Sequence, residues 1–203
     1  MKEKFDELIA LLKPLFKDNG FSKSALNFYK NTPNFICVIN FQKSSGNSSE
    51  RTRFYINCGI YALFIEATLG KEALSKPKEY ECHYRARAHE ITRTSATYYE
   101  LEPDSDVAKI YENVANDLGF VFKFFEQNSF EENLIELMLK QNGLAAINQL
   151  YEYLLIKDKS EILISHAKML YAKYGSEARW SKFENQINEL LRKYKKDEIN
   201  FKI

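Results

Sequence analysis

The sequence is poor in the residues that build phosphate-binding loops and disulfide frameworks. Its 203 residues include only seven glycines, which are scattered singly, so no glycine-rich loop for a nucleotide phosphate is present. Its three cysteines are odd in number and lack metal-ligand spacing, which indicates a reducing compartment. These shortages argue against nucleotide-binding, zinc-binding and disulfide-rich classes.

An excess of charge of one sign is also missing. Lys and Arg number 29, Asp and Glu number 28, and the isoelectric point is 7.6. This balance gives no overall electrostatic preference for nucleic acid or an anionic membrane. No apolar run approaches a membrane span, and the first residues carry acids where a signal peptide has none. We therefore expect a cytoplasmic protein with no membrane partner.

Apolar and aromatic residues are abundant enough for a packed core. They make up 45% and 14% of the chain, which suits one generous domain or one domain with an appended helical piece. The patterns predict an α+β fold. Residues 1–127 would form an α+β domain and residues 128–203 a helical extension, which could also pack with the first part as one unit.

The clearest strand signal is a β-hairpin between residues 35 and 61. Its arms are rich in β-branched and aromatic residues, and the loop between them has turn composition. Each arm carries one apolar row, so paired residue numbers must sum to an odd value if both rows face one core. A sum of 95 is favoured, which sets Cys37 opposite Cys58. Sums of 93 and 97 remain open.

Other segments would complete a sheet flanked by helices. Helical periodicity covers residues 3–19, where Pro14 predicts a kink or a break, and residues 104–126. With further strands, the antiparallel sheet would have four to five strands. The long helix should bury Ile110, Val114 and Leu118 against Ile39 and Ile56. The additional strands are predicted at 26–30, 80–87 and 96–101, and C-terminal helices at 130–141, 144–156, 159–174 and 177–195, followed by a frayed tail.

Several segments together resemble the bacterial family called domain of unknown function 4304. The resemblance covers about residues 4–125, and its most specific parts are the Gln42-Lys43-Ser44 and Asn57-x-Gly59-Ile60 runs. Residues 88–101 depart from the family pattern because the expected tryptophans near Tyr98 and Tyr99 are missing. The resemblance implies the succession of strands, and no activity carries over. The matching segments are Leu12–Leu15, Asn19–Phe21, Phe28–Lys30, Ile39–Ser44, Ile56–Ile60 and Glu81–Arg87.

Strand parity gives the hairpin a second, polar face. Its amide, phenol and guanidinium groups are directional donors and acceptors, whereas a merely solvated face would use Lys, Glu and Thr. Strand 80–87 would add His83, Arg85 and Arg87 if it pairs beside the hairpin. The alternative is an internal polar network covered by a helix. The predicted binding residues are Asn40, Gln42, Lys43, Arg53, Tyr55, Asn57, His83, Arg85 and Arg87.

Three functions fit these residues. The first is a non-enzymatic accessory module, immunity-like or regulatory, that binds another protein through the polar face. The second is a small-ligand binder or enzyme in which Gln42, Asn57, His83 and Arg85 converge. The third is a weak binder of single-stranded nucleic acid, a less favoured partner because acids interrupt the Arg-Tyr cluster.

No catalytic motif, cofactor site or metal site is predicted. Cys82, His83 and His89 match no zinc spacing, and Cys82 and His83 should lie on opposite faces of one strand. The cysteines occupy core-facing strand positions, where a thiolate is disfavoured, so we expect them to be reduced and structural. The sequence indicates no oligomeric state.

Overall fold

The computed structural model describes residues 1–94, 96–141 and 147–201. These residues belong to two compact units. The first consists of Met1–Leu63 and Leu74–Asn133, and the second of Phe64–Ala73 and Leu134–Ile203. The predicted domain boundary after residue 127 remains a prediction.

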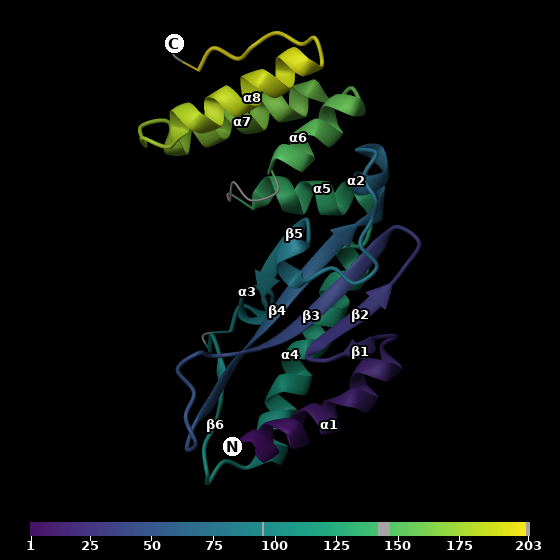
Figure 1. Ribbon diagram of the computed structural model, residues 1–203, viewed down its shortest axis with the longest axis vertical. Coiled ribbons are helices and arrows are strands. Elements are labelled where there is room, and N and C mark those ends of the chain that lie inside the picture. The colour runs from purple at the N-terminus through teal and green to yellow at the C-terminus, as the bar shows by residue number, and fades with distance from the viewer. Residues whose placement is uncertain (95, 142–146, 202–203) are drawn as a thin grey trace. The chain divides into compact units, whose positions relative to one another are not determined.

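A six-stranded antiparallel sheet is the centre of the first unit (Figure 1). Five strands follow one another in chain order, and β5 and β6 share the edge of β4 that β3 leaves open. The predicted α+β fold is confirmed. The sheet has one strand more than predicted because the three-residue β1 is too short to show alternation. The strands are β1 (Ser22–Ser24), β2 (Asn27–Asn31), β3 (Phe35–Lys43), β4 (Thr52–Ala62), β5 (Tyr84–Arg87) and β6 (Tyr99–Leu101).

The hairpin of β3 and β4 pairs with a residue-number sum of 97, as in the pair Asn40 and Asn57. The favoured sum of 95 is therefore wrong, and Cys37 faces Ile60 instead of Cys58. Both sums keep the apolar rows on one side, so alternation alone cannot choose between them.

Side-chain amides distinguish the two registers. In the observed register, Asn57 Nδ2 donates to Gln42 Oε1 at 2.8 Å and to Asn40 Oδ1 at 3.4 Å. At the loop end, Asn47 holds both backbone groups of Arg53: its Oδ1 accepts from the amide at 2.8 Å and its Nδ2 donates to the carbonyl at 3.0 Å. The loop residue thus acts as a strand partner and fixes the pairing where the arms separate.

One face of the sheet carries the aromatic core under α1 (Lys2–Asp18) and α4 (Val107–Asn128). The ring of Phe16 stacks on Phe28 with centroids 3.7 Å apart and meets Phe122 edge-on at 5.6 Å. Ring contacts of this kind add to the hydrophobic gain of burial. On α4, Val114 and Leu118 are fully buried, as predicted, whereas Ile110 is only half-buried.

Helix α1 continues through Pro14 without the predicted break. Pro14 is exposed, so water can satisfy the backbone carbonyl that its missing N–H leaves unbonded. The helix ends at Gly20, whose φ of +79° is a left-handed conformation that favours glycine. Phe21 then folds back, donating its backbone N–H to the Phe16 carbonyl at 2.9 Å.

The second face of the sheet is apolar at one end. A small cluster of Tyr29, Ile36, Val38, Tyr61 and Cys82 is buried there. Only residues 84–87 of the predicted strand 80–87 pair with β4, because Glu79–Glu81 form a 3-10 turn, η1. This turn places Cys82 on the second face, which overturns its predicted place in the other apolar row.

Cys82 reaches the sheet because residue 59 has no side chain. A Cβ built on Gly59 would lie 2.6 Å from Cys82 Sγ and 2.8 Å from Cys82 Cβ. Both distances are too short for a carbon contact, so any larger residue would displace Cys82 and the turn before it.

Helices make up the second unit. Tyr151, Tyr153 and Leu163 are among its fully buried side chains. The tail after α8 was predicted to fray, but Phe201 is buried and its ring lies 5.2 Å from that of Trp180, so this prediction is wrong. Predicted helix limits at 142–144 lie outside the described residues. The helices are α2 (Leu63–Thr68) and α5 (Glu131–Lys140), which straddle the unit limits, and α6 (Ile147–Ile156), α7 (Ser160–Tyr174) and α8 (Trp180–Lys193).

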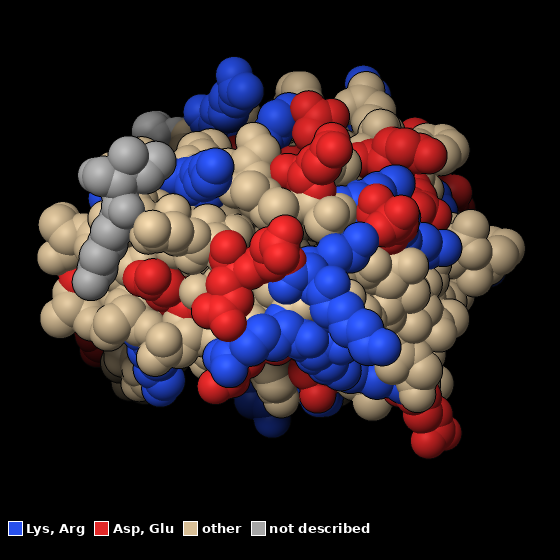
Figure 2. Space-filling model, turned by 90° about the horizontal axis from the view of Figure 1, so that it is seen from above, with Lys and Arg blue, Asp and Glu red and all other residues tan. Residues whose placement is uncertain are grey.

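Charges of both signs lie close together on the surface. On the face seen in Figure 2, a contiguous band of Lys and Arg borders groups of Asp and Glu. In the second unit, Glu152 accepts from Lys193 Nζ at 2.5 Å and from the Tyr194 hydroxyl at 2.9 Å. These bonds lower the pKa of Glu152, led by the bond from Lys193. Within the described residues, no helix is both long and apolar enough to cross a bilayer.

Replacing Gly59 by Ala should lower the free energy of unfolding by about 1–3 kcal/mol, because the new methyl group overlaps Cys82. Gly119→Ala is the matched control: a Cβ added there would have no atom within 4 Å, and alanine favours its helix by up to about 1 kcal/mol. Urea unfolding followed by circular dichroism measures both. Equal stability of the two variants would contradict the close packing of Cys82 on Gly59.

Candidate binding face

A row of four polar residues crosses the second face of the sheet, one from each of four adjacent strands. The strand registers set Asn27 beside Asn40, Asn40 beside Asn57, and Asn57 beside Arg87. We call Asn27, Asn40, Asn57 and Arg87 the asparagine row. Because each member comes from a different strand, the backbone hydrogen bonds of the sheet fix their spacing.

The amides of the row are hydrogen-bonded in one direction. Asn57 Nδ2 donates to Asn40 Oδ1, and Asn40 Nδ2 donates to Asn27 Oδ1 at 2.8 Å. Asn57 Nδ2 also donates to Gln42 Oε1 from the adjacent pair of the hairpin. The oxygens of Asn27, Asn40 and Gln42 are therefore used as acceptors, while Gln42 Nε2 and Asn27 Nδ2 donate to no described residue. Unused amide N–H groups therefore remain on Gln42 and on Asn27.

Two arginines lie over tyrosine rings beside the row. The guanidinium carbon of Arg87 is 4.3 Å from the ring centroid of Tyr55, and that of Arg53 is 3.9 Å from Tyr98. Arg53 also donates from Nε to Glu100 Oε2 at 2.9 Å. The two tyrosine rings meet edge-on at 6.2 Å. These cation–π contacts hold flexible cationic side chains in place on the sheet.

The structure gathers most of the predicted site residues. Asn40, Gln42, Tyr55, Asn57 and Arg87 lie together on the second face, and the Tyr55–Tyr98 contact joins Arg53 to them.

Three predicted residues are not part of this group. Arg85 is on the same face, but its Nη2 pairs with Glu79 Oε1 at 3.5 Å. The ammonium of Lys43 lies 4.0 Å from the Phe5 ring centroid, on the helix-covered side of the sheet. His83 is only 3% exposed, and its Nδ1 accepts from the Ala62 backbone N–H at 3.0 Å, so it belongs to the apolar end of the face.

Burial divides the gathered residues into a floor and a rim. Asn57 is 7% exposed and its amide hydrogens are used internally, whereas Gln42 and Arg87 are exposed. The hydrogen-bonded amides of Asn27, Asn40 and Asn57 form the floor. The rim consists of the exposed residues Gln42, Arg87 and Tyr98 together with the half-buried Arg53.

The sequence analysis missed three residues that build this face: Asn27, Tyr98 and Glu100. Asn27 has the same strand parity as Tyr29, so pairing the predicted strand at 26–30 with the hairpin would have placed it beside Asn40. Tyr98 and Glu100 reach the face through the short strand β6, whose pairing with the far end of β4 has no local sequence signal.

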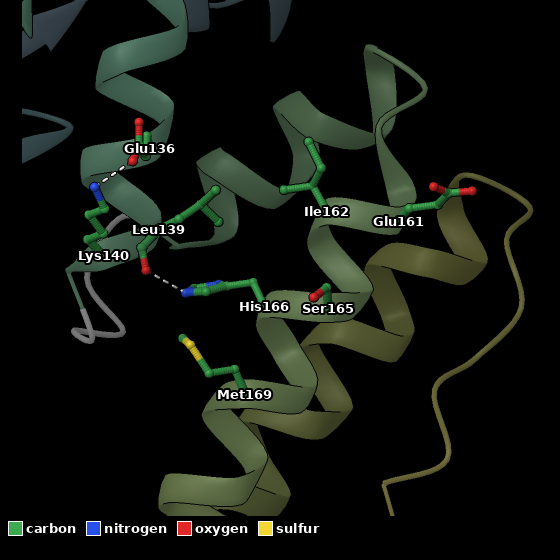
Figure 3. Close-up of a pocket in the computed structure, with 8 residues that line it drawn as sticks. All are labelled: Glu136, Leu139, Lys140, Glu161, Ile162, Ser165, His166 and Met169. Carbon is green, nitrogen blue, oxygen red and sulfur yellow. Dashed lines mark hydrogen bonds and ion pairs between the residues drawn. The ribbon is translucent and has the colours of Figure 1, made fainter.

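The second unit contains an open groove between α5 and α7 (Figure 3). Its volume is about 630 Å³, and its apolar side chains are Leu139, Ile162 and Met169. Ile162 and Met169 are 41% and 48% exposed, so α7 presents an apolar stripe there. The groove was not predicted from the sequence, where only a helix at 159–174 was expected.

The histidine in the groove wall is held on both sides. His166 Nε2 lies 2.8 Å from the Leu139 carbonyl, to which it donates, and Nδ1 lies 2.9 Å from the Tyr151 hydroxyl. Burial lowers the pKa of His166, although the bond to Leu139 opposes the shift. A neutral ring with both nitrogens engaged is suited to packing and not to proton transfer.

The geometry of the first unit defines an α+β domain with an aromatic core on one sheet face and an amide and guanidinium surface on the other. A family model described as "Domain of unknown function (DUF4304)" matches residues 12–127, and the chain belongs to that family. The resemblance read from the sequence is thereby confirmed, and the match includes the whole asparagine row. No curated protein and no solved structure matches the chain.

The three cysteines are free and buried. Burial raises the pKa of Cys37 to about 11 from an ordinary value of 9, and it raises the pKa values of Cys58 and Cys82 as well. Thiols of this kind are poor nucleophiles at neutral pH. No group of three or more His, Cys, Asp or Glu side chains in the described residues is arranged to hold a metal ion.

The raised thiol pKa values predict a loss of stability in alkali. Thiols of the unfolded chain ionise near pH 9, whereas Cys37 in the fold keeps its proton to about pH 11. The thiols should therefore add no pH dependence below pH 8 and should lower the stability above pH 9, by up to about 1.4 kcal/mol per pH unit for each buried thiol. Urea midpoints between pH 7 and 10.5 under reducing conditions measure this. Cys37→Ala should flatten the slope, and an unchanged slope would contradict the assignment.

Proposed function

We propose that the chain is a non-enzymatic, cytoplasmic accessory module that binds another protein through the rim of the asparagine row. The observation that carries this proposal is the exposed pair of Gln42 and Arg87 above a hydrogen-bonded floor. An immunity-like or regulatory role belongs to the proposal by analogy with small accessory proteins.

The composition and rigidity of the rim support protein binding. Arg and Tyr are enriched among the residues that dominate protein interfaces. Arg87 and Arg53 already lie over tyrosine rings, so ordering them on binding costs less entropy than ordering free side chains. The backbone under the rim is held by three strands, and preorganised surfaces of this kind suit a specific partner.

A small-ligand site built from Gln42, Asn57, His83 and Arg85 is not supported by the geometry. His83 is buried against Ala62, five residues along β4 from Asn57, a separation of about 16 Å at strand spacing. These four groups therefore do not converge on one small molecule. The rim instead extends along and across strands, as a macromolecular contact requires.

A photo-crosslinking residue placed at Gln42 tests the proposal directly. In native lysate it should give one discrete cross-linked protein. The same residue at Lys109, an exposed position on α4, should give none. The Arg87→Ala variant should keep its melting temperature and capture the partner at least tenfold less, because Arg87 is exposed and its contact is the Tyr55 ring. Asn57→Ala, in the buried floor, should instead lose about 1–3 kcal/mol of stability.

Two outcomes would count against the protein-binding face. The first is the same cross-linked proteins at positions 42 and 109. The second is early unfolding of the Arg87→Ala variant, which would assign Arg87 to the internal network and not to a binding surface.

A second candidate function is binding of a small apolar molecule in the groove of the second unit. Its volume of about 630 Å³ lies within the usual range for small-molecule pockets. Eight residues line it, whereas a stable protein interface uses roughly 20–30 residues a side, so the groove suits a small molecule better than a folded partner.

The neutral fluorophore N-phenyl-1-naphthylamine probes the groove. Its emission should rise on binding, and Ile162→Asp should weaken binding at least tenfold because a carboxylate then enters the apolar wall. Lys168→Asp is the matched control, since Lys168 is exposed on the same helix and does not line the groove. Equal binding by both variants would place the probe elsewhere and remove the support for this function.

A further inference from the structure

We propose that the group recognised by the rim is a carboxylate from an acidic segment of the partner protein, held between Arg87 and Gln42. This inference rests on the proposed function, because it names the chemistry of the same surface. It follows from three features: which donors remain unused, which charges remain uncompensated, and which ring faces are already covered.

At Gln42 and Arg87, the hydrogen-bonding groups of the side chains that remain unused are donors. Gln42 Oε1 is engaged by Asn57, so the amide presents its Nε2 hydrogens outward. Arg87 adds the N–H groups of its guanidinium and no acceptor. A ligand that meets both side chains must therefore supply acceptor atoms, and a carboxylate has two oxygens for this purpose.

Arg87 is also the uncompensated cation of this face. Glu100 pairs with Arg53 at 2.9 Å and with Arg51 at 3.8 Å, and Glu79 pairs with Arg85. Among the described residues, the guanidinium of Arg87 lies over a tyrosine ring and has no ion pair, while the Glu90 carboxylate accepts from the Arg87 backbone N–H at 2.5 Å. The unbalanced charge favours an anionic ligand at Arg87 over a neutral one.

Gln42 and Arg87 come from the strands on either side of β4 and both lean over it. The bond to Asn57 draws Gln42 toward β4 from β3, and the contact with Tyr55 draws Arg87 toward β4 from β5. Asn57 and Tyr55 are neighbours on the same face of β4. The two donors therefore end over neighbouring same-face residues of β4, about 7 Å apart at strand spacing, a gap that one planar carboxylate between them can bridge.

Single-stranded nucleic acid fits this surface less well. Its binding relies on bases stacking on open aromatic faces in a continuous cationic groove. Here Arg87 lies over Tyr55 and Arg53 lies over Tyr98, while Glu79 and Glu100 interrupt the positive charge. The geometry favours a carboxylate on a protein over a phosphate backbone.

A blocked hexaglutamate peptide tests the inference by nuclear magnetic resonance. It should shift the side-chain resonances of Gln42 Nε2 and Arg87 Nε, whereas a blocked hexaglutamine peptide should not. Arg87→Ala should weaken binding about tenfold or more, as the loss of one charge-assisted contact implies. Arg87→Lys should restore only part of the affinity, because a lysine keeps the charge but not the planar fork. Lys109→Ala, which removes one exposed charge from α4, should have no effect.

Each alternative outcome has a definite meaning. Shifts of the same resonances by hexathymidylate at equal or lower concentration would overturn the carboxylate in favour of phosphate. Equal weakening by Arg87→Ala and Lys109→Ala would reduce the effect to general charge and also overturn it. A protein cross-linked at position 42 without any response to hexaglutamate would refute the carboxylate and leave the proposed function standing. A response to hexaglutamate without a cross-linked protein at position 42 would refute the protein-binding role and leave the recognition of a carboxylate standing.

Discussion

The pairing of β3 with β4 at a residue-number sum of 97 is the constraint on which the rest of the first unit depends. It sets Asn40 opposite Asn57, and the registers of β2 and β5 then extend the pair into a row across four strands. A shift of two residues would keep every apolar side chain in the core yet separate these amides. The polar side chains therefore select among registers that hydrophobic burial leaves equivalent.

The same pairing decides which half of the second face is covered. It brings Gly59 between Val38 and Arg85, where the missing side chain lets Cys82 and the turn before it pack on the sheet. That end of the face becomes a small apolar core. At the other end of this face, the amides of the floor hydrogen-bond with one another, so they need no covering helix as a partner.

Much of the face could be predicted from strand parity, because parity depends only on position within a strand. It correctly placed Asn40, Gln42, Tyr55, Asn57 and Arg87 on one side. It also gave the face of His83 but not its burial at the apolar end, before β5 begins, and it failed for Lys43 because that residue continues the strand on the core side instead of lying in the loop. The register, the role of Asn27 and the α5–α7 groove depend on contacts between distant segments, which no local pattern encodes.

The division into floor and rim explains how one set of residues can serve both stability and binding. A floor of buried amides is costly to disturb, since each removed partner leaves a polar group unsatisfied. The rim is held by that floor: Gln42 through its bond to Asn57, and Arg87 through its register with Asn57 and its contact with Tyr55. Rigid support of exposed donors by a second layer is what a specific binding surface requires. The buried Asn57 thus orients the groups proposed to meet a partner and does not itself reach the surface.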